Sequence, residues 1–381
     1  MFYKHNFFLF FYNSFLSEFN MIFDVRYNEI ALKGGNRLFF ENKLIENIRL
    51  MLAREDMTAK VTRERGYILL DVDKDISHIL KKTFGIKYFR TISKTERNIP
   101  ALKEACLKYF EGFDRNRSFK VTARRMDKRY EMNSTEVAKE IGLFIERKTG
   151  IFGDIINPDY VLEITVAKNT FLISDNKHKG LGGLPVGVTG KVLCLISGGI
   201  DSPVAVWMVM KRGCTPILYT VACVKDKDVA IVNELKEKLE EYSPLKIKLI
   251  NETIEDFNKI VLKLAEKKQE AFNCLVFKHY LLHRAEDLAS KEKCLGLVTG
   301  DNLAQVASQT LENLNAQRMD LKLPVYSPLI GMDKDDIIEM SEKIGLFKIS
   351  IRHQEDYFFL PRNPITRTKI EEFKRVLDFI K

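Results

Sequence analysis

Residues Ser197–Ser202, which read SGGIDS, carry the residue types and spacing best suited to chemistry in this chain. They follow an apolar run, and Gly198 and Gly199 lack a Cβ, so their backbone N–H groups can approach an anion closely. Ser202 is expected to cap the helix that follows, and Pro203 suits its first turn. The N-terminus of that helix adds a partial positive charge. The stretch therefore predicts a cradle for a pyrophosphate group.

Asp201 is the unusual member of this stretch, because a carboxylate repels phosphate unless a cation lies between them. A Mg²⁺ ion bound by Asp201 would resolve the conflict. The alternative is a tight turn in which the aspartate only caps a helix. The spacing matches neither the Walker pattern, which needs Gly-Lys-Ser/Thr, nor GxGxxG. A P-loop NTPase and a dinucleotide-binding dehydrogenase are therefore disfavoured.

The elements around this stretch alternate between strands and helices from residue 191 onward. Strands are expected over 191–197, 215–223, 245–251 and 294–300, with one long helix from about 254 to 291. Such alternation predicts a doubly wound parallel sheet with helices on both faces, that is, an α/β fold. Ligands of these sheets lie beyond the carboxyl ends of the strands. The loops 197–201 and 300–309 both follow strands, so we expect them on one rim.

Two smaller α+β segments precede this sheet. The first, 21–74, opens with a strand and holds a Gly-Gly turn with Lys33 and Arg37, which either contacts phosphate or is a plain turn with solvated charges. The second, 75–177, is expected to contain helices over 76–86 and 101–113, a strand over 118–125 and two strands within 159–174. Its helix over 132–150 has the capping-box pair Asn133 and Glu136, and Gly150 follows it.

Basic residues crowd into the second segment. Within 115–129 these are Arg115, Arg117, Lys120, Arg124, Arg125, Lys128 and Arg129. Clustered guanidinium and ammonium groups can neutralise phosphates. The whole chain has a net charge of +9 and no apolar stretch long enough to cross a membrane. We therefore expect a nucleic-acid partner rather than a membrane, with simple solubility as the alternative explanation of the charge.

The remaining features concern boundaries and location. The glycine-rich stretch 178–190 is expected to be a linker before a domain at 191–381, and the aromatic-rich residues 1–20 an extension upstream of a natural start at Met21. The six cysteines show no CxxC spacing, which disfavours a zinc ribbon or a disulfide framework. A reducing, cytoplasmic location fits this usage.

S-G-G-x-D-S after a strand resembles the PP-loop signature of ATP pyrophosphatases. Four further stretches, RYNEIALKGGNR (26–37), KGLGGLPVG (179–187), LVTGDNLAQVASQTLENL (297–314) and PLIGMDKDDII (328–338), occur with it in the order typical of the tRNA 4-thiouridine synthetase family. The resemblance implies a ferredoxin-like domain at 21–74, a THUMP domain at 75–177 that binds tRNA, and a PP-loop domain. It also implies that ATP adenylates O4 of uridine U8, after which sulfur displaces AMP.

The resemblance also implies site residues. Nucleotide contacts carried over from the family are Leu195, Ile196, Tyr219, Thr220, Lys278, Gly300 and Gln309. The alternative explanation of Lys278 is a solvated residue on a helix, and that of Gln309 is a helix cap or a buried amide in the core. Members of the family often serve thiamine thiazole synthesis as well, and a homodimer is an open alternative for the assembly.

The sulfur-handling residues depart from the family. Tyr357 stands where bacterial members carry a catalytic cysteine, and Phe277 interrupts the CxxC that begins at Cys274, so no iron–sulfur cluster is expected. The stretch GDNLAQ (300–305) and Ser327 also differ from the residues that members of the family usually carry at these positions. We therefore expect an external sulfur donor, either sulfide or a carrier such as a cysteine desulfurase. Cys274 is the one candidate for sulfur relay, and a buried apolar cysteine is the alternative. Two other functions stay open: a PP-loop enzyme with another nucleophile, and a tRNA-binding module with no turnover.

Overall fold

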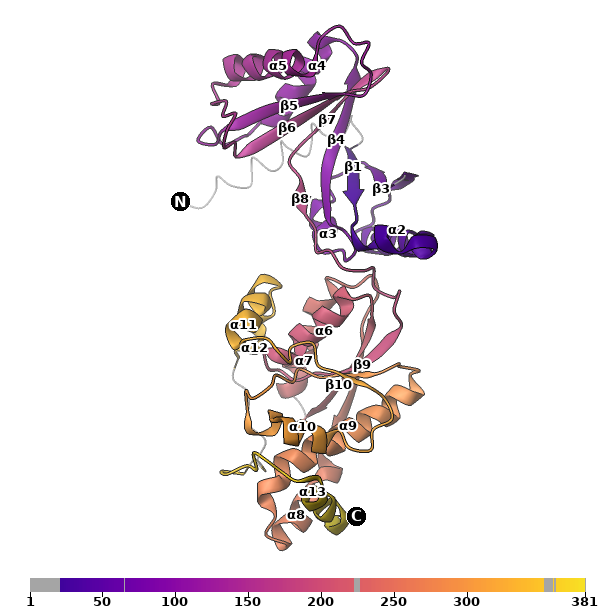
Figure 1. Cartoon of the computed structure of the whole chain (residues 1–381), viewed down its shortest axis with the longest axis vertical. Coiled ribbons are helices and arrows are strands. Elements are labelled where there is room, and N and C mark those ends of the chain that lie inside the picture. Colours follow the sequence, from indigo (N-terminus) through magenta and orange to yellow (C-terminus); the bar gives the residue numbers. More distant parts are fainter. Residues whose placement is uncertain (1–20, 65, 223–226, 353–358, 360, 381) are drawn as a thin grey trace. The chain divides into compact units, whose positions relative to one another are not determined.

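The computed structural model describes residues 21–64, 66–222, 227–352, 359 and 361–380 (Figure 1). The chain forms two compact units. Unit 1 takes the described residues up to Arg37 together with Met51–Gly182, and unit 2 takes Leu38–Leu50 together with Gly183 onward. Helix α2 (Arg37–Ala53) therefore supplies residues to both units. None of the helices in the described ranges combines the length and the hydrophobicity that crossing a bilayer requires.

Unit 1 is built on one eight-stranded sheet with the order β2-β3-β1-β4-β7-β6-β5, and β8 pairs with β4. All pairs are antiparallel except β5 with β6. The strands are β1 Met21–Arg26, β2 Lys60–Glu64, β3 Tyr67–Val72, β4 Tyr88–Glu96, β5 Phe119–Arg125, β6 Tyr160–Val166, β7 Thr170–Ser174 and β8 His178–Lys179. In addition to α2, unit 1 contains the helices α3 Ser77–Leu80, α4 Ile99–Leu107 and α5 Ser134–Thr149.

The half of this sheet that contains β6 has one apolar and one polar face. On β6, Leu162, Ile164 and Val166 are buried in a core with α4 and α5, whereas Glu163 and Thr165 alternate with them and point the other way. The polar face can therefore receive a ligand.

Two predictions for helices of unit 1 have different outcomes. The predicted capping box of α5 is confirmed, because Asn133 and Glu136 exchange both bonds, and Gly150 has φ 72°. The predicted helix over 76–86 is wrong beyond its first turn, because α3 ends at Leu80 and Gly85 adopts φ 99°.

Unit 2 contains a five-stranded parallel sheet with the order β11-β10-β9-β12-β13, which confirms the predicted α/β class. The strands are β9 Lys191–Leu195, β10 Thr215–Ala222, β11 Lys248–Thr253, β12 Leu297–Val298 and β13 Val325–Tyr326. The helices are α6 Asp201–Lys211, α7 Lys227–Glu240, α8 Glu255–Glu266, α9 Asn273–Lys291, α10 Leu311–Gln317, α11 Lys334–Lys343, α12 Phe347–Ser350 and α13 Ile370–Ile380. From the central β9 the chain runs outward to β10 and β11 and then crosses to β12 and β13 on the other side, so the carboxyl end of β9 is the switch point of the sheet.

Two helices replace the single long one predicted over 254–291. Helix α8 ends at Glu266, Lys268 adopts a left-handed φ of 57°, and α9 starts at Asn273. The break lets Leu264 and Phe272 enter the same apolar core, together with residues of α9 and α13. No glycine or proline occurs between 267 and 272, so the sequence carried no local signal for the break.

The glycine-rich connector is anchored on both of its sides. In unit 1, the N–H of Gly182 donates to the carbonyl of Ile86. In unit 2, the N–H of Leu184 donates to the carbonyl of Lys211 at 3.0 Å, and a Cβ on Gly183 would lie only 2.2 Å from that oxygen. Gly183 is thus required for close backbone approach. The domain boundaries predicted around this segment stay a prediction.

Candidate functional site

The SGGIDS loop connects β9 to α6 at the carboxyl edge of the parallel sheet, and two serines fix its shape. The N–H of Ser197 donates to Oγ of Ser202 at 2.9 Å, and the two hydroxyl oxygens lie 3.2 Å apart. Ser350 donates to the carbonyl of Gly199. The prediction that Ser202 caps the helix is wrong: α6 starts at Asp201, and its N-cap Ile200 forms no side-chain cap bond. The hydroxyl of Ser202 instead closes the loop.

The glycines of the site leave room for a ligand to approach the backbone, and they are not needed for unusual backbone angles. Neither Gly198 nor Gly199 has a positive φ, so any residue could adopt their conformation, and what they provide is the absence of a side chain. Gly300 follows β12, and a Cβ there would lie 2.7 Å from N and 2.8 Å from Cα of Ser202. The two loops that we expected on one rim therefore touch through their backbones.

Asp201 is engaged on both carboxylate oxygens. Nζ of Lys334, at the start of α11, lies 2.6 Å from Oδ1, and Nε2 of Gln305 lies 3.4 Å from Oδ2. An ammonium thus lies where we expected a cation to reconcile the carboxylate with phosphate. Sequence reasoning missed Lys334, although it occurs in the quoted stretch PLIGMDKDDII. Its distance from Asp201 in the sequence, 133 residues, hid the pairing.

A second charged cluster lies at the same rim, around the buried carboxylate of Asp301. It accepts from Lys278 at 3.3 Å, from Thr299 at 2.8 Å and from Arg318 at 2.9 Å. Burial by itself raises the pKa of Asp301, but Lys278, Thr299 and Arg318 outweigh it and hold the pKa below its usual range. Asp301 is therefore ionised at neutral pH. Lys278, for which a purely solvated role was one alternative, is in an ion pair.

The other predicted nucleotide residues lie close to the loop in the sheet or after β12. Leu195 is the last residue of β9 and Ile196 follows it, and the N–H of Ile196 donates to the carbonyl of Tyr219 at 2.9 Å. The ring of Tyr219 points into the core and its hydroxyl donates to Glu252, and Thr220 is buried as well. Only their main chains could then meet a ligand. Gln309 is buried, and its Oε1 has no hydrogen-bond partner among the described residues.

The sulfur candidates give no assembled thiol site in the described part of the chain. Cys274, near the start of α9, is half-buried and unpaired with any other cysteine, and Phe277 one turn later is buried. Tyr357 lies outside the described residues. No cluster of three or more metal-ligating His, Cys, Asp or Glu side chains occurs within the described ranges.

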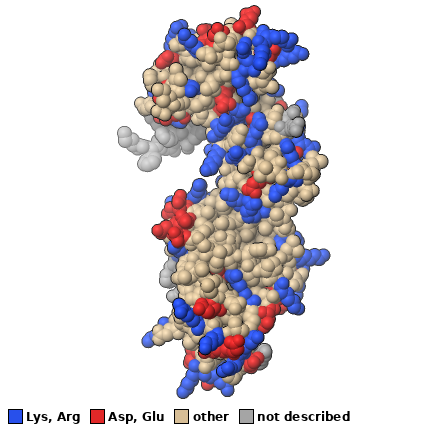
Figure 2. Space-filling view, in the orientation of Figure 1, with Lys and Arg blue, Asp and Glu red and all other residues tan. Residues whose placement is uncertain are grey.

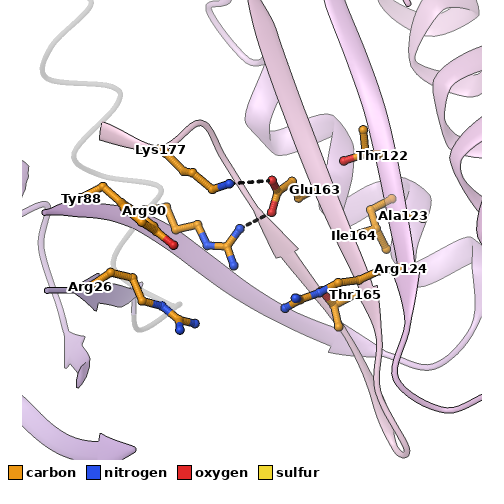
Figure 3. A pocket seen from close by; sticks show the side chains of 10 residues that line it. All are labelled: Arg26, Tyr88, Arg90, Thr122, Ala123, Arg124, Glu163, Ile164, Thr165 and Lys177. Atoms are coloured by element: carbon orange, nitrogen blue, oxygen red, sulfur yellow. Dashed lines mark hydrogen bonds and ion pairs between the residues drawn. The ribbon is translucent and has the colours of Figure 1, made fainter. Parts of the chain in front are cut away.

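The polar face of the unit 1 sheet contains a pocket of about 360 Å³ (Figure 3). Glu163 pairs with Arg90 and, at 3.5 Å, with Lys177. Arg26 and Arg124 border the same space, and Figure 3 shows them flanking this central trio. The lining contains four basic side chains and the carboxylate of Glu163, and the buried carboxylate of Asp24 also pairs with Arg26 and Arg90. Four positive charges against two negative ones favour an anionic ligand.

The predicted RNA-binding residues do not all share this face. On β5, Lys120 and Arg124 lie on the polar face, whereas Arg125 shares the side of Val121, whose methyl group lies 3.9 Å from the Cβ position of Gly142 in α5. Exposed or half-buried positions elsewhere in unit 1 are occupied by Lys33, Arg37, Arg115, Arg117, Lys128 and Arg129. Figure 2 shows lysines and arginines spread over unit 1 on the face drawn.

Comparisons with known proteins agree over most of the chain. The family model described as thiamine biosynthesis protein (ThiI) matches residues 187–381, the ThiI ferredoxin-like domain matches 22–89, and the THUMP domain matches 96–175. A protein of Thermoanaerobacter sp. (strain X514) named probable tRNA sulfurtransferase is 37% identical over 362 residues, covering 91% of this chain and 92% of the relative.

Two further matches extend this picture. A probable tRNA sulfurtransferase of Coxiella burnetii (strain RSA 493 / Nine Mile phase I) is 36% identical over 365 residues, covering 91% of each chain. A crystal structure of a 4-thiouridine synthetase–RNA complex with bound ATP is 32% identical with a TM-score of 0.84, covering 95% of each chain.

The fold and the SGGIDS loop define a PP-loop α/β protein that also carries ferredoxin-like and THUMP domains. With more than half of its residues matched by one family model and relatives above 30% identity over nearly its full length, the chain belongs to the ThiI family. It is accordingly an enzyme of the sulfurtransferase class, and the predicted family is confirmed.

Proposed function

We propose that this chain is an ATP-dependent tRNA sulfurtransferase that makes 4-thiouridine at U8. One observation carries the proposal: the SGGIDS loop lies at the switch point of a parallel sheet, closed by a Ser197–Ser202 bond and contacted by the backbone at Gly300. Backbone N–H groups next to a helix N-terminus suit the inner phosphates of ATP, and the N–H of Gly199 would exchange its 3.3 Å bond to Oγ of Ser197 for a phosphate oxygen. The ATP-bound relative supports the choice of nucleotide.

The residues present fit Mg²⁺ held largely by the nucleotide. Asp201 is a half-buried carboxylate beside the loop, and Mg²⁺ in nucleotide sites commonly uses one or two carboxylates together with phosphate oxygens and water. The ion, when bound, would neutralise phosphate charge. Lys334 holds Asp201 in place and adds a second positive charge at the same point.

RNA would bind to unit 1 through its basic side chains. The pocket on the polar sheet face gathers Arg26, Arg90, Arg124 and Lys177, and a phosphate or sugar edge fits its volume and charge. The other predicted RNA-binding residues add charge around it. The RNA in the relative's complex supports this class of partner.

The proposed reaction has two steps. O4 of the uridine attacks the α-phosphorus of ATP, the bond to pyrophosphate breaks, and pyrophosphate leaves. Sulfide, as HS⁻, then forms a bond to C4, and the C4–O4 bond breaks, so that AMP carries O4 away and the proton of HS⁻ replaces the one that N3 lost on adenylation. A carrier persulfide would also need a second thiol, which cleaves the S–S bond and supplies the two electrons. Because Tyr357 and Phe277 stand where the family carries its sulfur-handling cysteines, we propose that the sulfur comes from sulfide or from a carrier protein, with Cys274 the one relay candidate.

The decisive experiment measures pyrophosphate and 4-thiouridine after incubation with unmodified tRNA, ATP and Mg²⁺, with and without sulfide. We expect thiolation only with sulfide or a carrier. Asp201→Ala should abolish pyrophosphate release and leave tRNA affinity near the wild-type value, while Asp336→Ala, an exposed carboxylate on α11, should change neither. Absence of pyrophosphate under every condition would leave a tRNA-binding protein without turnover. Release of pyrophosphate with a product other than 4-thiouridine would indicate another nucleophile.

A second experiment tests the RNA surface. Arg124→Glu combined with Arg125→Glu should weaken tRNA binding and reduce the slope of log K against log[salt] by about one for each phosphate that is no longer neutralised. Lys374→Glu, at an exposed position of α13, is the matched control. Equal affinities and slopes for all three proteins would contradict the assignment. Thiamine synthesis, a homodimer, a cytoplasmic location and a natural start at Met21 stay predictions.

A further inference from the structure

Arg318 and the backbone that carries it make several contacts that have no role in the reaction proposed above. It directly follows α10, and the carbonyls on both sides of it are held by α9: His279 lies 3.1 Å from the carbonyl of Gln317, and His283 lies 3.0 Å from that of Met319. The two imidazoles contact each other, with ring centroids 4.2 Å apart. Each ring donates an N–H to its carbonyl, so the backbone that carries Arg318 is fixed from both directions.

The guanidinium of Arg318 is only partly engaged. Its Nη2 donates to Oδ2 of Asp301 at 2.9 Å and to Oγ of Ser327 at 2.6 Å. Among the described residues both of these side-chain bonds come from Nη2 and none from Nη1, and Nε is buried and has no partner there. The side chain keeps 26% of its surface exposed. Nη2 therefore anchors the group, Nε is enclosed, and Nη1 stays available to a ligand.

The cluster also has surplus positive charge and lies near the loop. Lys278 and Arg318 share the one carboxylate of Asp301, which leaves a net charge of +1 at this rim. Asp301 directly follows Gly300, whose Cβ position is 2.7 Å from the backbone nitrogen of Ser202. The cluster thus adjoins the loop that we propose for phosphate.

We propose that Arg318 is a phosphate-binding residue of the nucleotide site, acting with Lys278, and that His279 and His283 are its positioning residues. This inference rests on the proposed function. Asp301 orients the guanidinium, Ser327 fixes its plane, and the unpaired nitrogen donates to a phosphoryl oxygen of ATP. Arginine suits this role because its planar fork stays charged and donates in a fixed direction.

A structural role for Arg318, limited to neutralising Asp301, is the rival explanation, and a double variant separates the two. Arg318→Gln alone removes both a neutralising charge and a phosphate donor. Arg318→Gln combined with Asp301→Asn restores the balance of charge but not the donor. Arg375→Gln, at an exposed position of α13, is the matched control.

The test measures equilibrium affinity for ATP, AMP and pyrophosphate by calorimetry, the melting temperature, and the KM for ATP in pyrophosphate release. We expect both Arg318 variants to bind ATP about tenfold to a hundredfold more weakly, as loss of one charge-assisted hydrogen bond would produce. The double variant should regain melting temperature without regaining affinity. Comparison of AMP with pyrophosphate identifies which phosphate is contacted. His279→Gln keeps an N–H donor and should stay near wild type, whereas His279→Ala should raise the KM more than it lowers kcat.

Recovery of ATP affinity in the double variant would overturn the proposal, because neutralising Asp301 would then be the whole role of Arg318. So would an effect of Arg318→Gln confined to tRNA affinity, which would assign the cation to RNA. If the wild-type protein neither binds ATP nor releases pyrophosphate, the proposed function itself fails. If the wild type does both and Arg318→Gln matches Arg375→Gln, only the present inference fails.

Discussion

A single methyl group at Gly300 tests whether the two loops of the candidate site must touch. In Gly300→Ala the new Cβ would lie 2.7 Å from N and 2.8 Å from Cα of Ser202, and 3.0 Å from the carbonyl carbon of Asp201. All three atoms belong to the backbone, so no side-chain rotation can relieve the contact. Gly300 does not have a positive φ, so the substitution introduces no backbone strain of its own.

The expected cost follows from that contact. Overpacking of a tightly packed site by one methyl group destabilises a protein by about 1–3 kcal/mol. For a unit of this size, that lowers the melting temperature of unit 2 by roughly 2–12 °C. The SGGIDS loop or the 300–309 loop must also move, and a shift of about 1 Å in a phosphate site can cost about a hundredfold in rate. We therefore expect a strong loss of pyrophosphate release, with tRNA affinity unchanged because unit 1 is untouched.

The control is another glycine in the same unit. A Cβ on Gly331 would meet nothing within 4 Å, and its φ is not positive, so Gly331→Ala should preserve both the melting temperature and pyrophosphate release. Calorimetry and a coupled pyrophosphate assay on the two variants give the comparison. If Gly300→Ala behaves like Gly331→Ala in both measurements, the close contact between the loops is not needed, and the argument built on it is wrong.

Three further predictions concern stability. Asn313→Ala removes a fully buried amide that bonds three main-chain groups, so it should cost about 3–5 kcal/mol in unfolding free energy. Asn133→Ala removes the capping box with Glu136 and should cost about 1 kcal/mol, measured by denaturant unfolding. Burial, and after it the charge of His283, lower the pKa of His279 from 6.5 to about 4, so the neutral ring stabilises the fold fully above pH 6.5. As the pH falls to 4, the free energy of unfolding should decrease by at most about 3 kcal/mol, and by less once solvent screening is counted.

Each of these predictions has its own check. Asn133→Ser retains a capping oxygen and should recover most of the loss seen with alanine. Asn313→Ala should lower the denaturation midpoint, and an unchanged midpoint would mean that water replaces the lost amide. His279→Gln keeps the donor but cannot titrate, so its stability between pH 4 and 6.5 should fall less steeply than that of the wild type. Parallel pH profiles would show that another group governs the acid limb.

Local patterns in the sequence carried much of the fold. The alternation of strands and helices after residue 190 predicted the parallel sheet, and Asn133 with Glu136 predicted the start of α5. Both signals act over a few residues, through side-chain periodicity or a single turn of backbone, so no distant contact is needed to recognise them. SGGIDS likewise marked the loop between β9 and α6, because strand, glycines and helix start are contiguous.

Only the tertiary structure decided which side chains meet at that loop. Lys334 reaches Asp201 across 133 residues, and Arg318 joins Lys278 on Asp301, because the strand order brings the ends of β9, β12 and β13 to one edge. Sequence periodicity assigns a residue to a face but not a strand to its neighbours, so these pairs had no local signal. For the same reason the bonding of Ser202 back to Ser197, which replaced the expected cap, and the break between α8 and α9 became visible only once the packing was known.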